Sequence, residues 1–151
     1  MFVATLSLIA LVASAVPSVR ASIVRRASPR PGETMLAVVV QPTDVTLGSY
    51  QGSFRFAPGA FSIVSVVTPS NDGTRVLNAA DTAKGVIRFA GFTVNGFRSR
   101  DVLVLVVREK RRLDAANLAA DLTVATDLQG KSVPASRILP ARGLSDEAGR
   151  N

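Results

Sequence analysis

The sequence predicts an all-β protein, a two-sheet antiparallel β-sandwich of jelly-roll type. From Met35 onward, short runs rich in β-branched and aromatic residues alternate with clusters of Gly, Pro, Asn and Asp. This alternation is typical of strands joined by turns. No long helical pattern interrupts the runs, and a series of short, regularly spaced strands suits a sandwich.

Eight strands follow from these runs. They are expected at residues 35–41, 48–56, 61–67, 75–78, 85–92, 102–108, 121–127 and 132–138. The second and third should form a hairpin-like unit around the corner Pro58-Gly59, because both residues favour turns. The stretch 113–121 has helical propensity and is compatible with one turn of helix.

Alternation with a period of two assigns the faces of these strands. In the strand 48–56, the core side should carry Tyr50, Gly52, Phe54 and Phe56, and the surface side Ser49, Gln51, Ser53 and Arg55. In the strand 85–92, Arg88 points outward. The strand 102–108 is apolar on both faces, which favours a central strand covered on both sides. An exposed apolar surface that binds a partner is the alternative for that strand.

Composition excludes several kinds of chemistry. The chain has 151 residues, enough for one domain, and 47% of them are hydrophobic. It contains no His and no Cys, so disulfides, zinc sites and Ser-His-Asp or Cys-His catalysis are excluded. The aspartates are scattered over expected turns and strand ends without a paired spacing. We therefore predict no enzyme and no cofactor, with loop-bound calcium as the open alternative.

The positive charge is spread unevenly. The formal net charge is +7, and the segment 20–33 carries four arginines against one glutamate. The basic run 108–114 lies where a strand should end and is interpreted as a solvated turn, with an anion-contacting patch as the alternative. Because no dense basic stripe with interleaved aromatics is present, nucleic-acid binding is not predicted.

The ends of the chain differ from its body. Residues 1–15 are uncharged and apolar and end in Ala13-Ser14-Ala15, which predicts a signal peptide. They are too short for a stable membrane span, so we expect a secreted or cell-envelope protein. Residues 16–34, with three prolines and four arginines, are expected to be a flexible basic linker. The folded domain should occupy 35–139, followed by a disordered tail at 140–151.

The order of these segments resembles the cohesin-like domains, which belong to the cellulose-binding-type sandwich superfamily. The most specific parts are the strand that runs into the corner Phe56-Ala57-Pro58 and the strand Gly-Val-Ile-Arg-Phe-Ala at 85–90. The resemblance covers about 35–138. It implies a non-catalytic, nine-stranded jelly roll that binds a dockerin-like protein through one sheet face, and relatives of the same sandwich bind polysaccharide.

The resemblance also implies where a partner would bind. The candidate partner-binding residues are the outward positions Gln51, Ser53, Arg55, Asn78 and Arg88. Plain solvated sheet surface is the alternative for all five. We expect a secreted module that recognises a protein partner, with polysaccharide binding or a structural role in the envelope as alternatives. Exposed aromatic rings on a flat sheet would favour polysaccharide, whereas a mixed polar and apolar patch around Gln51 and Arg88 would favour a protein.

Overall fold

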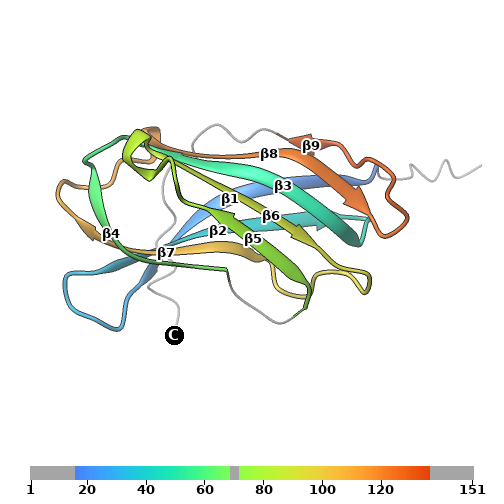
Figure 1. Ribbon diagram of the computed structural model, residues 1–151, viewed down its shortest axis with the longest axis horizontal. Coiled ribbons are helices and arrows are strands. Elements are labelled where there is room, and N and C mark those ends of the chain that lie inside the picture. The colour runs from blue at the N-terminus through green and yellow to red at the C-terminus, as the bar shows by residue number, and fades with distance from the viewer. Residues whose placement is uncertain (1–15, 69–71, 137–151) are drawn as a thin grey trace, which may run out of the picture.

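The computed structural model describes residues 16–68 and 72–136, which form a sandwich of two sheets (Figure 1). Its strands are β1 (Ser18–Ala27), β2 (Thr34–Thr43), β3 (Leu47–Phe56), β4 (Phe61–Val67), β5 (Thr74–Asn78), β6 (Val86–Phe92), β7 (Asp101–Glu109), β8 (Leu118–Asp127) and β9 (Ala135–Ser136). Sheet A has the order β4-β7-β2-β1-β9, and sheet B has the order β5-β6-β3-β8. Neighbouring strands are antiparallel except β1 and β9. The predicted β-sandwich is confirmed.

The hydrophobic core lies between the two sheets. Its largest fully buried side chains are Phe54, Phe89, Leu36, Ile87, Leu103 and Leu105. In β3 the predicted alternation is confirmed for Tyr50, Phe54 and Phe56, which are buried, and for Gln51 and Arg55, which are exposed. Ser53, predicted on the surface, is buried instead. One face of β3 therefore belongs to the core, and the other faces outward.

The apolar strand β7 is central, as predicted. It lies between β4 and β2 in sheet A. Leu103, Leu105 and Val107 are completely buried, and Val104 and Val106 on the other side are half-buried. Both faces are thus at least partly covered, which explains why residues 102–107 of this strand are all apolar.

The prediction of a flexible linker at 16–34 is wrong. Residues Ser18–Ala27 form β1, which pairs with β2 over its whole length. The prolines flank this strand and do not interrupt it, and Val19, Ala21 and Ile23 contribute to the core. Two arginines of the strand are neutralised by β7: Arg25 donates to Glu109 at 2.5 Å, and Arg26 donates to Asp101 at 2.5 and 2.9 Å.

The hairpin-like unit around Pro58-Gly59 is also corrected. β3 pairs with β6 and β8 in sheet B, whereas β4 pairs with β7 in sheet A. The corner is therefore a crossover between the sheets. Its backbone is held by bonds to two other segments, since the N–H of Phe56 donates to the carbonyl of Gly85 and the N–H of Ala57 to that of Asn117.

The remaining differences are at the end of the chain. The stretch 113–121 contains a 3₁₀ turn at Ala115–Asn117, and β8 begins directly after it at Leu118. The strand expected at 132–138 is reduced to β9 within the described residues. The predicted signal peptide and C-terminal tail lie outside those residues. No helix in the described part of the chain is long and apolar enough to cross a membrane.

Candidate functional site

The outward face of sheet B brings together all five residues predicted from the sequence. Strand register places Asn78 of β5 beside Arg88 of β6, Arg88 beside Ser53 of β3, and Ser53 beside Asp121 of β8. This defines one polar row across the four strands. The other two predicted residues are in β3 on either side of that row, Gln51 two positions before Ser53 and Arg55 two positions after it.

Acidic residues hold the cations of this face in place. Arg88 donates to the Asp81 carboxylate, and Lys84 donates to its other oxygen at 3.1 Å. Hydrogen bonds from Arg88 and then Lys84 hold the pKa of Asp81 below its usual value. The Arg55 Nε lies 3.8 Å from an oxygen of Asp121, whose carboxylate is nearly buried. The charges are therefore oriented, which reduces the entropy lost when a partner binds.

Ser53 differs from the other predicted residues because it is only 9% exposed. Its small side chain lies in register between the longer Arg88 and Asp121. Gln51, Arg55, Asn78 and Arg88 are all exposed. Ser53 therefore separates two longer side chains, and the four exposed residues form the accessible polar surface.

Sequence reasoning missed the apolar half of the same face. A second row beside the polar one runs through Val76, Ala90, Gln51 and Val124. Val76 is 60% exposed and Val124 45%, and Phe92, two positions beyond Ala90, is 59% exposed. Phe92 lies an even number of positions from Arg88, so the alternation that placed Arg88 outward contained the signal for Phe92 as well.

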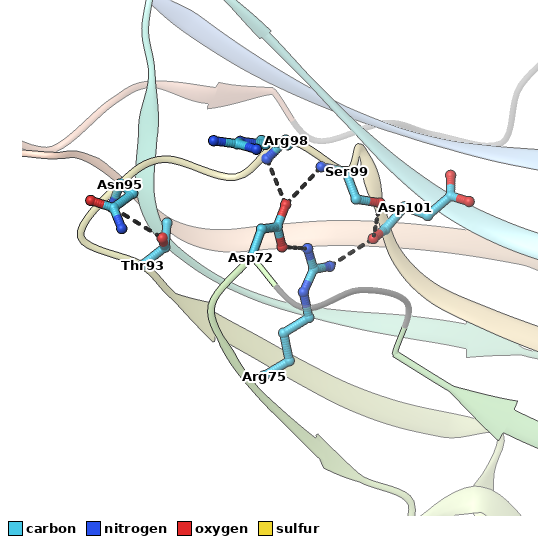
Figure 2. Close-up of polar contacts among 7 residues, drawn as sticks. All are labelled: Asp72, Arg75, Thr93, Asn95, Arg98, Ser99 and Asp101. Carbon is cyan, nitrogen blue, oxygen red and sulfur yellow. Dashed lines mark hydrogen bonds and ion pairs between the residues drawn. The ribbon is translucent and has the colours of Figure 1, made fainter.

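The end of sheet B nearest Phe92 is tied to the loop that leads into β7. Figure 2 shows Asp72, just before β5, pointing toward this loop. One Asp72 oxygen accepts the backbone N–H groups of Arg98 and Ser99 at 2.6 and 2.8 Å, and the other accepts from Arg75 at 2.7 Å. The loop therefore has a fixed position relative to the sheet.

Arg75 completes this connection from the core side of β5. Its side chain is only 3% exposed. It donates to the carbonyl oxygen of Asp101 at 2.7 Å, and its guanidinium lies 5.0 Å from the ring centre of Phe97. A buried arginine is stable only with such partners, because an uncompensated charge in the interior is costly.

The described residues contain no group of three or more His, Cys, Asp or Glu side chains that could hold a metal ion. Eight of their nine acidic side chains bind other parts of the chain. Six of them are in ion pairs, namely Glu33, Asp72, Asp81, Asp101, Glu109 and Asp121. Asp114 and Asp127 accept backbone N–H groups within turns. These carboxylates thus stabilise the fold.

Comparison with solved structures identifies the architecture. A non-cellulosomal cohesin from the archaeon Archaeoglobus fulgidus superposes with a TM-score of 0.56 and 18% identity, covering 81% of this chain and 86% of its own. A type II cohesin domain from the cellulosome of Acetivibrio cellulolyticus gives 0.56 and 12%, covering 84% and 94%. The chain has a cohesin-like fold.

Several solved neighbours with this fold are cohesins in complex with a dockerin. One is a type I cohesin-dockerin complex from Clostridium thermocellum, with a TM-score of 0.54 and 10% identity, covering 78% of this chain and 94% of the neighbour. No family model matches the sequence, and no curated protein matches it. The likeness is therefore one of fold, and the resemblance predicted from the sequence motifs is confirmed at that level.

Proposed function

We propose that this domain is a non-catalytic module that binds a protein partner through the outward face of sheet B. The observation that carries the proposal is the pairing of two rows on one face. The polar row offers oriented charges at Arg88 and Arg55, and the adjacent row offers exposed aliphatic side chains at Val76 and Val124. Apolar contact area surrounded by oriented polar groups is the composition of protein interfaces.

Polysaccharide binding is the weaker alternative. Flat carbohydrate surfaces are bound by exposed aromatic rings that stack on the sugars. The only tyrosine of the chain, Tyr50, is 3% exposed, and the chain has no Trp. Among the described residues, Phe92 is the only exposed aromatic side chain. The solved cohesin-dockerin complex from Clostridium thermocellum also supports a protein partner.

A non-catalytic role is supported by the use of the acidic side chains. Glycoside hydrolysis needs two carboxyl groups facing one substrate. Of the nine acids in the described part of the chain, six are in ion pairs and two accept turn N–H groups. The ninth, Asp44, has a φ of 53° in the turn between β2 and β3. This arrangement favours recognition over chemistry.

The proposal is tested with two charge-matched variants of the full chain as bait. Arg55→Glu with Arg88→Glu reverses two charges on sheet B. Arg20→Glu with Arg111→Glu reverses two exposed charges elsewhere, on β1 and in the β7–β8 loop. We expect a partner from the producing cell's envelope or medium to bind the wild type and the second variant but not the first.

The interaction is then measured with the purified partner by calorimetry, and the melting temperature of each variant verifies its fold. Equal affinity of all three proteins for that partner would refute binding through sheet B. Capture of a soluble polysaccharide in gel retardation, lost in the sheet B variant, would favour the alternative function.

We infer that the protein is exported, on the basis of the apolar segment 1–15. N-terminal sequencing of the mature protein should find cleavage after Ala15. An intact N-terminus would contradict a cleaved signal.

A further inference from the structure

A depression of about 850 Å³ opens at the end of sheet B, where β5 begins and β6 ends. Its lining includes Thr74 at the start of β5 and Phe92 at the end of β6, together with Val94, Asn95 and Arg98 from the loop that follows. Phe92 is 59% exposed and Val94 is 72% exposed. Two large apolar side chains thus line an open hollow that continues the apolar half of sheet B.

Hydrogen bonds fix the position of the loop that lines this depression. Asp72 binds two successive backbone N–H groups of the loop, and the buried Arg75 holds Asp72 and the Asp101 carbonyl. Gly96 has a φ of 83°, and a Cβ there would lie 2.5 Å from Thr46. A site whose shape is fixed before binding loses less entropy when it is occupied.

The charge of the depression is positive at its rim. The Asp72 carboxylate lines the hollow, but both its oxygens already accept hydrogen bonds. Arg98 is bound through its backbone N–H, and Figure 2 shows its side chain directed away from Asp72. The Arg98 guanidinium is exposed and forms no ion pair within the described residues.

We propose that this depression is the anchor site for the protein partner and that it binds a segment carrying a large apolar side chain next to a carboxylate. The apolar side chain packs against Phe92 and Val94, and the carboxylate pairs with Arg98. This inference rests on the proposed function, because it extends the same face of sheet B. A volume of about 850 Å³ exceeds one side chain and suits a short peptide segment.

The chemistry of the site also explains why its occupant is acidic. A carboxylate accepts two parallel hydrogen bonds from a guanidinium group, which makes Arg98 selective for carboxylates over neutral groups. A basic segment would place a like charge beside Arg98, and the repulsion between the two charges would disfavour its binding.

The test uses a random peptide library displayed on phage and selected against the full chain. On the wild type, we expect enrichment of peptides with an aromatic or aliphatic residue beside Asp or Glu. Phe92→Ser should weaken the enriched peptides by about thirtyfold, the scale of a central apolar anchor. Arg98→Glu should weaken them by about tenfold, and selection on this variant should enrich Lys or Arg in place of the acid.

Val67→Ser is the matched control, because Val67 is an exposed valine of the other sheet; this variant should bind the peptides as the wild type does. Failure to enrich any peptide, or enriched peptides indifferent to Phe92 and Arg98, would overturn the anchor site. Peptides or partners that depend on Arg88 but not on Phe92 would overturn it while leaving the proposed function intact. If binding of the partner depended on no residue of sheet B, the proposed function itself would be refuted.

Discussion

Tyr50 should titrate at an unusually high pH. It is the only tyrosine of the chain and is 3% exposed. Its ring lies against Phe97 and Phe89, with ring centres 4.8 and 6.2 Å away. Burial raises the pKa of Tyr50 from 10.0 to about 12, although the positive charge of Arg75 acts in the opposite direction. The cause is that the interior disfavours the phenolate more than it disfavours the neutral phenol.

This shift makes the stability of the fold depend on pH in the alkaline range. Below pH 10, Tyr50 is neutral in both states and contributes no pH dependence. Between pH 10 and about 12, the phenol ionises in the unfolded chain but not in the folded one, so stability falls as the pH rises. Two pKa units correspond to a loss of about 2.7 kcal/mol from the free energy of unfolding, at about 1.4 kcal/mol per pH unit.

The assay is the near-ultraviolet absorbance of tyrosinate, followed against pH in the native protein and in denaturant. Because the chain has one Tyr and no Trp, the signal reports Tyr50 alone. We expect a midpoint near 10 in denaturant and well above 11 in the native protein, and Tyr50→Phe should flatten the alkaline loss of stability. A native midpoint near 10, or an equally steep loss in Tyr50→Phe, would refute this account of the core.

Three other predictions test individual contacts within the two sheets. Arg26→Ala should lower the free energy of unfolding in urea by about 1 kcal/mol, because its bond to Asp101 is only partly screened by solvent; an unchanged urea midpoint would contradict that value. Arg88→Gln should raise the pKa of Asp81 toward its ordinary value, since Arg88 is the main cause of its lowering; carboxyl NMR titration measures this, and an unmoved pKa would show that Lys84 suffices. Gly91→Ala should cost about 1–3 kcal/mol, because a Cβ there would lie 2.4 Å from the Tyr50 ring; calorimetric melting should show the loss, and a wild-type melting temperature would mean that the ring can move.

Period-two alternation explains how much of the fold the sequence could predict. The strand Phe61–Val67 is predicted at its observed bounds, and the two faces of β3 are predicted correctly except for the burial of Ser53. β1 was missed because its arginines and flanking prolines have the composition of a linker. Only the tertiary fold supplies Glu109 and Asp101, which neutralise Arg25 and Arg26. Similarly, the partners of Pro58-Gly59 lie far away in sequence, so a crossover could not be distinguished from a hairpin.

Period-two alternation also predicted part of the candidate site. Alternation and the family resemblance placed five residues on one face, and the register then joined them. The depression could not be foreseen, because it depends on Asp72 binding backbone N–H groups at Arg98 and Ser99. No periodic pattern predicts a contact between two loops that are separated by two strands and the turn between them. The alternation that places Arg88 outward also places Phe92 outward, four positions later in the same strand.

The contrast between the two outward faces gives a physical reason for assigning recognition to sheet B. On sheet A, Arg26 of β1 binds Asp101 of β7, and β2 lies between them. This ion pair therefore spans β2, whose residues Ala37 and Val39 are buried outside the central core cluster at 0% and 7% exposure.

On the outward face of sheet B the ion pairs of Arg55 and Arg88 are grouped at one end, and the other end leaves Val76, Phe92 and Val124 open to solvent. Burial of apolar area is the main favourable term in association. A partner therefore gains apolar contact area by covering this end of sheet B, whereas the residues Ala37 and Val39 of β2 in sheet A are already removed from water.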